Sequence, residues 1–119
     1  MGVAIYGSHH DVGERITAYV ESMSPGTDAT MFGRGTASAD GAALANASFG
    51  HAVDFDDTFE SIVIHPTSPV FSAAFVTGEA NNATGKDVLS AEDAATAYDA
   101  ISTLAEEGSL EKLINAVSN

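Results

Sequence analysis

The stretch that decides the fold is Ala42–Pro69, AALANASFGHAVDFDDTFESIVIHPTSP. It begins as an alanine-rich run, and alanine has the highest helix propensity and is small enough to let neighbouring helices approach closely. It continues with polar and titratable side chains and reaches His65, where the following Pro66 disfavours helical geometry. The stretch therefore predicts a packed helix, capped by Asp40 and running to about Asp57, that gives way to a loop.

Towards the N-terminus, the sequence predicts one clear helix and little sheet. Apolar residues after Asp11 recur at the spacing of one helix face and stop at Ser24-Pro25-Gly26. Residues 27–39 are rich in Gly, Thr and Ser, and they favour a loop with at most one short strand, at Ala29–Phe32. Residues 1–7 are apolar and typical of the end of a helix.

Towards the C-terminus, further helices are expected. Thr67 or Ser68 can cap a helix whose apolar residues lie on nearly all sides, which predicts a central, buried element. A polar turn at residues 81–86 precedes two more predicted helices, at about 90–106 and from Ser109 onward. The predicted class is all-α, with about five helices and at most one short strand.

The composition narrows the possible functions. The 119 residues make one domain or part of one, and the absence of cysteine excludes disulfides and thiolate metal sites. With 17 Asp and Glu against 4 Lys and Arg, the net charge is -13, so we expect no binding to nucleic acid or anionic membranes. Dispersed acid with scarce lysine is typical of proteins from a very salty cytoplasm; the alternative is a cation-binding surface.

Neither a membrane span nor a secretory leader is expected. The sequence has no apolar run of about 18 residues, and its N-terminus lacks a basic segment followed by an apolar core. We therefore expect a cytoplasmic location.

The candidate functional residues cluster after the alanine-rich run. On a continuous helix, His51, Asp54 and Thr58 would lie within about 60° of one another, whereas Asp56 would point away. His65, returning from the exit loop, would complete an acid–base and hydrogen-bonding group. The alternative is a capped helix end with solvated acids and a hydrogen-bonded histidine.

The same stretch allows two other motif interpretations. A metal site made of His51, Asp54, Asp57 and His65 has acceptable ligand types, but no spacing singles it out, so we predict no metal and no cofactor. Residues 54–58, DFDDT, fit the D-x-D-x-T motif of haloacid-dehalogenase-type phosphatases. That chemistry requires a buried strand before Asp54, and the preceding residues favour a helix.

Three segments, in order, resemble the N-terminal part of the MmgE/PrpD family, which includes 2-methylcitrate dehydratase and cis-aconitate decarboxylase. They are GVAIYGS at 2–8, GRGTASADGAALANASFGHAVDFDDT at 33–58, and HPTSPVFSAAFVTGEANNATGKDVL at 65–89. The resemblance implies a helical domain of a cofactor-free lyase or isomerase. Such an enzyme abstracts a proton next to a carboxylate, and loss of water or carbon dioxide follows.

The resemblance also implies roles for particular residues. Asp54 and Thr58 would hold or orient a di- or tricarboxylate, and His65 would bind it or transfer protons, with Asp54 and His65 as the catalytic candidates. His51 and Asp57 are carried over as further binding positions. Family members are longer and have a second, lid domain, so we expect a truncated, incomplete site without robust catalysis.

The resemblance also suggests how the chain is divided. It covers residues 1–89, and residues 90–119 are interpreted as a separate helical pair that is similar to the family's C-terminal end. A function of a different class is also open, namely a non-catalytic helical module that self-associates into a homo-oligomer.

Overall fold

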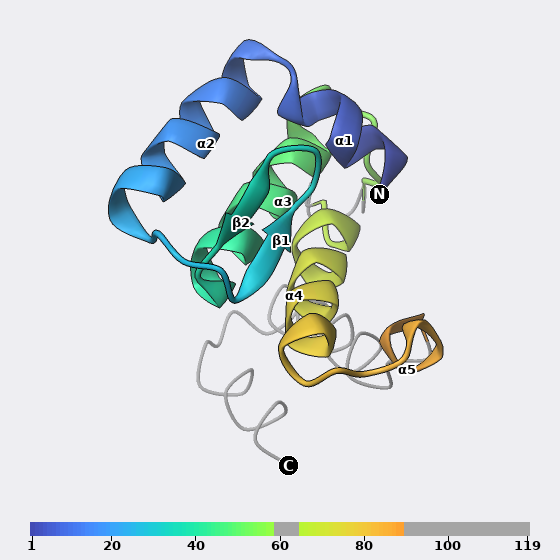
Figure 1. Ribbon diagram of the computed structural model, residues 1–119. Coiled ribbons are helices and arrows are strands. Elements are labelled where there is room, and N and C mark those ends of the chain that lie inside the picture. Colours follow the sequence, from blue (N-terminus) through green and yellow to red (C-terminus); the bar gives the residue numbers. More distant parts are fainter. Residues whose placement is uncertain (59–64, 90–119) are drawn as a thin grey trace, which may run out of the picture.

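The computed structural model describes residues 1–58 and 65–89 of the chain. Over these residues the fold is mostly helical, with five helices and one two-stranded sheet, so the predicted class is confirmed. In chain order the elements are α1 (Gly2–Ser8), α2 (Asp11–Met23), β1 (Ala29–Met31), β2 (Gly35–Ala37), α3 (Ala39–His51), α4 (Thr67–Ala80) and α5 (Gly85–Leu89) (Figure 1). The helices predicted at about 90–106 and from Ser109 lie outside the described residues.

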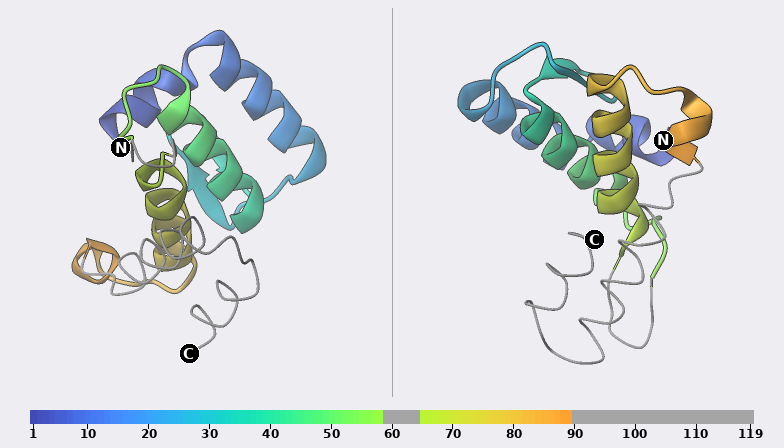
Figure 2. Two further views of the ribbon diagram at one scale, coloured as in Figure 1. Left: turned by 180° about the vertical axis from the view of Figure 1, so that it is seen from behind. Right: turned by 90° about the horizontal axis from the view of Figure 1, so that it is seen from below.

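Helix α3 is the central element. It packs against α1, α2, α4 and the two strands, and Figure 2 shows it between α2 and α4. Ala42, Ala45 and Phe49 recur at helical spacing along it, and all three are completely buried. Because the alanine side chains add little volume, neighbouring elements can approach the α3 backbone. Val20 and Met31 belong to the same buried core as Phe49.

Helices α2 and α4 differ in how well the sequence predicts them. The end of α2 agrees with the sequence signals, but α4 is less buried than the sequence predicts. Helix α2 ends at Met23, directly before the Ser-Pro-Gly segment, as predicted. On α4, Ser72, Val76 and Gly78 are buried, but Ala73 and Thr77 are exposed. This helix therefore covers the core with one side only.

The two strands form a small antiparallel hairpin. Ala29 pairs with Ala37 and Met31 with Gly35. Gly33, in the connecting turn, has a φ of 75°, a left-handed conformation that glycine adopts without steric cost. Strand β1 overlaps the predicted strand, but β2 was not predicted. A three-residue segment carries almost no strand signal of its own, and pairing with β1 defines it.

Side chains from two helices hold the outer edge of β1. The buried Asn46 side chain of α3 accepts a hydrogen bond from the Phe32 N–H at 2.7 Å and donates one to the Thr30 carbonyl at 2.9 Å. The Glu79 carboxylate of α4 accepts the Thr30 N–H at 2.7 Å. The hairpin is thereby fixed to α3 and α4 through its backbone groups.

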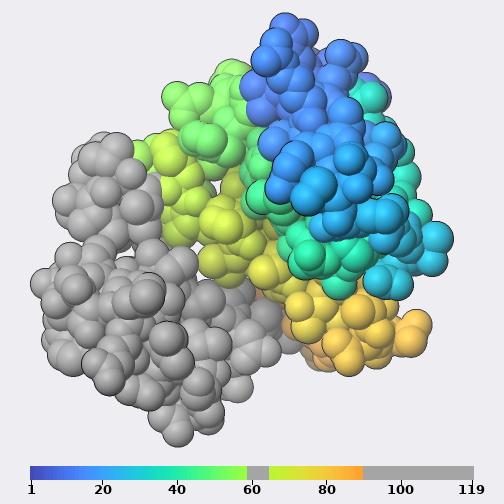
Figure 3. All heavy atoms as spheres, turned by 90° about the vertical axis from the view of Figure 1, so that its left-hand side faces the viewer, coloured from blue at the N-terminus to red at the C-terminus, as the bar shows by residue number. Residues whose placement is uncertain are grey.

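The outer faces of α1 and α2 carry apolar side chains that remain exposed: Val3, Ile5, Tyr6, Val12, Tyr19 and Met23. Figure 3 shows these two helices, in blue, on the surface that faces the viewer. Within residues 1–58 and 65–89, no helix has both the length and the apolar character needed to cross a membrane. Self-association stays a prediction.

Helix α3 begins two residues earlier than expected. Its N-cap is Ser38, and Asp40 lies in the first turn. The Ser38 hydroxyl donates to an Asp40 carboxylate oxygen at 2.6 Å and approaches the Ser24 carbonyl at 3.1 Å. The hydrogen bond from Ser38, helped by the backbone N–H of Gly41, lowers the pKa of Asp40 below its ordinary value.

Replacing Ser38 by alanine is expected to raise the pKa of Asp40 towards its ordinary value. The hydrogen bond stabilises the charged carboxylate, so its contribution is present above the ordinary pKa and is lost as the pH falls through the folded-state pKa. An NMR titration of the Asp40 carboxyl carbon measures the change. Asp87, whose pKa is lowered by Thr84, is the internal control. An unchanged Asp40 titration would contradict the assignment of this hydrogen bond.

Candidate functional site

The candidate site begins where α3 ends, at His51 rather than near Asp57 as predicted. Residues 52 and 53 form a turn, in which the Asp54 N–H donates to the His51 carbonyl at 3.0 Å. Asp54 itself has a φ of 54°, outside the range of an α-helix. Aspartate tolerates this left-handed conformation better than most residues do, and here it turns the chain away from the helix axis.

The early end of α3 overturns the expected arrangement of the acidic residues. Thr58 does not share a helix face with His51 and Asp54, because residues 52–58 are not helical. Asp56, which was expected to point away, is instead the carboxylate that both histidines approach. Its side chain is only 6% exposed.

Two imidazoles and two carboxylates meet at this point. His51 Nδ1 lies 3.1 Å from Asp56 Oδ1, and His65 Nδ1 lies 3.4 Å from the same oxygen. His65 Nε2 lies 4.0 Å from Asp54 Oδ1. The two imidazole rings are 4.5 Å apart between centroids. His65 therefore does return to the end of α3, and Asp54 and His65 lie on the same side of the molecule.

Asp56 is held in its charged form. Burial alone would raise the pKa of its carboxyl group, but hydrogen bonds from His51 and Ser68 outweigh that effect, and the pKa lies below its ordinary value. The Ser68 hydroxyl donates to Oδ2 at 3.0 Å, and Oδ1 is the oxygen that lies near a ring nitrogen of both histidines. Helix α4 thus helps to hold the carboxylate through Ser68.

The other two candidate residues, Asp57 and Thr58, lie outside this group. An Asp57 carboxylate oxygen accepts the Thr67 N–H at 3.1 Å at the start of α4, which is a helix-capping contact. Thr58 is exposed at the end of the described segment. Neither side chain belongs to the group of four formed by His51, Asp54, Asp56 and His65.

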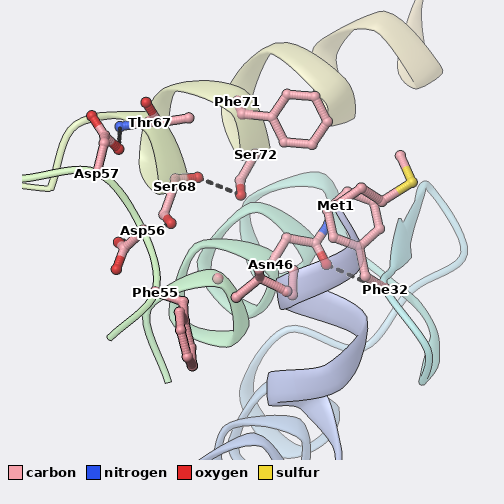
Figure 4. Close-up of a pocket in the computed structure, with 13 residues that line it drawn as sticks. Met1, Phe32, Asn46, Phe55, Asp56, Asp57, Thr67, Ser68, Phe71 and Ser72 are labelled. Carbon is pink, nitrogen blue, oxygen red and sulfur yellow. Dashed lines mark hydrogen bonds between the residues drawn. The ribbon is translucent and has the colours of Figure 1, made fainter. Parts of the chain in front are cut away.

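A cavity of about 340 Å³ adjoins the group (Figure 4). Phe32 and Phe71 line its apolar part, whereas Asp56, Asp57 and Ser68 form a polar end. Asp56 therefore belongs both to the histidine group and to the cavity wall. Among the described residues that line the cavity, none is Lys or Arg.

The model of the MmgE/PrpD N-terminal domain matches residues 1–116 of the sequence. The chain belongs to the MmgE/PrpD family. Comparison with curated proteins and with solved structures gave no match. The division of this MmgE/PrpD chain at residue 89 stays a prediction, because the segment that follows lies outside the described residues.

The structure contradicts the phosphatase interpretation of residues 54–58. It needs a strand directly before Asp54, and the structure has helix α3 and a turn there. The roles assigned by resemblance to Asp54, Thr58, His65, His51 and Asp57 stay predictions. The structure adds Asp56 to the residues near the centre of the site.

Proposed function

We propose that this chain contributes the acid–base part of an MmgE/PrpD-type carboxylate lyase site, acting in the cytoplasm. In such a site a proton is abstracted next to a carboxylate of a di- or tricarboxylate, as in 2-methylcitrate dehydratase, and water or carbon dioxide is then lost. The observation that carries the proposal is the buried Asp56 carboxylate with an imidazole nitrogen 3.1 Å and another 3.4 Å from one of its oxygens.

Asp56 gives His51 a defined role. Both Asp56 oxygens lie within hydrogen-bond distance of His51 Nδ1, at 3.1 and 3.2 Å. A carboxylate that accepts the Nδ1 proton leaves Nε2 as the basic nitrogen, so the His51 ring can take a proton from a substrate carbon. His65 is the second proton-transfer candidate, and its Nε2 is directed towards Asp54.

The cations that a tricarboxylate requires are scarce around this group. Carboxylate substrates are usually held by Arg or Lys through charge-assisted hydrogen bonds. The guanidinium of Arg34 donates to the Ser8 carbonyl at 2.9 Å instead, and the cavity wall has no basic residue among those described. We therefore expect weak substrate binding and no robust turnover by this chain alone.

The four histidines provide the test. Titrating the chain with cis-aconitate or 2-methylcitrate, in the presence of a metal chelator, should shift the ring NMR signals of His51 and His65 at millimolar ligand. His9 and His10, at the α1–α2 junction, should stay unchanged as internal controls. A phosphate monoester of similar charge should leave all four signals in place.

Two results would count against the proposal. Shifts that are equal at all four histidines would indicate nonspecific association, and no shift at His51 and His65 would show that these residues do not form the binding group. The same NMR samples report substrate loss. Rapid turnover that His65→Ala abolishes would refute the expected lack of catalysis by the isolated chain.

We infer that the acidic composition is an adaptation to high salt. At a net charge of -13, self-repulsion opposes the compact state, and salt screens it. Helical circular dichroism is expected to be lost at low ionic strength and restored by molar KCl. Sucrose, which favours compact states without screening charge, is the control and should restore less. Helicity that is indifferent to KCl would contradict the inference.

A further inference from the structure

We propose that His51, Asp54, Asp56 and His65 form a binding site for a divalent transition-metal ion such as Zn²⁺. Each residue offers one donor atom, and the four donor atoms all lie within 4.8 Å of one another. The residues come from the end of α3, the turn that follows it, and the residue that precedes Pro66. The site is thus assembled by the chain reversal rather than by a sequence motif.

The distances within the group suit a small ion. Zinc bonds to imidazole nitrogen and carboxylate oxygen are about 2.0–2.2 Å, so ligand atoms in a tetrahedral site lie roughly 3.4 Å apart. The separations from Asp56 Oδ1 to His51 Nδ1 and His65 Nδ1 are 3.1 and 3.4 Å. The Asp54 side chain is 80% exposed and can rotate to bring its oxygen closer.

An unsatisfied nitrogen supports the proposal independently of the distances. His65 Nδ1 is buried and has no hydrogen-bond partner among the described residues, although Asp56 Oδ1 lies 3.4 Å away. A separation of 3.4 Å is longer than an ordinary N–H···O hydrogen bond, and a buried imidazole nitrogen without a partner is unfavourable. An ion between the imidazoles and the carboxylate would accept the lone pair of this nitrogen.

The chemical type of the ligand atoms, and the hydrogen bond that holds the Asp56 carboxylate, indicate which ion would bind. Two imidazoles with two carboxylates suit Zn²⁺ or Co²⁺, whereas Ca²⁺ and Mg²⁺ prefer oxygen ligands alone. Ser68 donates to Asp56 Oδ2, so the oxygen that faces the histidines is held in place by a residue outside the ligand set. A bound ion would also place positive charge beside the cavity.

Metal binding can be measured without any substrate. A bound ion would take the lone pair of His51 Nδ1 and so replace the His51–Asp56 hydrogen bond of the metal-free site, which means that failure of metal binding would leave the lyase proposal standing. Titration of the full chain with Co²⁺ should give visible absorption bands that saturate at one equivalent. Titration with Zn²⁺ should shift the ring NMR signals of His51 and His65 and leave those of His9 and His10 unchanged. Excess Ca²⁺ or Mg²⁺ should not reproduce these shifts.

Variants make the test specific. His51→Ala and Asp56→Asn should each weaken Zn²⁺ binding by roughly 10–100-fold or more, whereas the double variant His9→Ala/His10→Ala should bind as the unaltered chain does. Should Asp56→Asn lose its helical circular dichroism, Asp54→Asn serves instead, because asparagine also tolerates a positive φ. Equal shifts at all four histidines, or unchanged affinity in His51→Ala, would overturn the proposal.

Discussion

Replacing Phe49 by alanine is expected to lower the free energy of unfolding by about 3–5 kcal/mol. Phe49 is completely buried on α3 and belongs to the core with Ala4, Val20 and Met31. Truncation removes apolar contacts within this core and leaves a cavity that helix packing can close only in part. For a domain whose total stability is on the order of 5–15 kcal/mol, this is a large fraction.

The Phe49 prediction is checked by thermal unfolding at a salt concentration that gives full helicity. The melting temperature should fall by roughly 10–20 °C. Phe55→Ala is the matched control, because its side chain is 79% exposed and little apolar surface leaves the core. Equal effects of the two substitutions would show that the core is not centred on α3.

Replacing Asn46 by alanine is expected to cost about 2–4 kcal/mol, since each buried polar group left without a partner costs about 1–3 kcal/mol. The Asn46 side chain is 1% exposed and pairs with the Phe32 N–H and the Thr30 carbonyl. Alanine removes both partners at once. Unfolding in urea measures the loss, and amide exchange at Phe32 should become faster than at its neighbours.

Asn81→Ala is the matched amide control for this second substitution. Asn81 is exposed, and its side chain donates to the Thr77 carbonyl at 2.8 Å within the last turn of α4. Surface substitutions of this kind usually change stability by about 0.5 kcal/mol or less. If Asn46→Ala were equally mild, water would have to replace the amide at β1, and the hairpin would be anchored less firmly than the contacts imply.

The parts of the fold that local signals define could be predicted. Helix α2 ends at Met23 because Ser24, Pro25 and Gly26 do not continue a helix. The end of α3 could not be predicted, because Ala52 and Val53 continue the apolar pattern and residues 52–58 contain no glycine or proline. It depends on the left-handed Asp54 and on contacts from Asp57 to Thr67, which are distant in sequence.

The positions of the candidate residues could also be predicted only in part, because some of their contacts join residues that are distant in sequence. His65 was expected to return to the end of α3, because Pro66 stops a helix there, and its distance from Asp54 agrees. Asp56 was missed because its place was worked out on a helix that the chain does not form. Its hydrogen bond to Ser68 joins residues twelve positions apart, so only the arrangement of α3 and α4 reveals it.

The backbone of Thr30 has a consequence for how this molecule meets other chains. Strand addition to an exposed sheet edge needs free N–H and C=O groups along that edge. At the centre of β1 both groups are already occupied by side chains of the same molecule, Glu79 and Asn46. An intruding strand would first have to break these bonds, so edge-to-edge aggregation through the β1 edge of the hairpin is disfavoured.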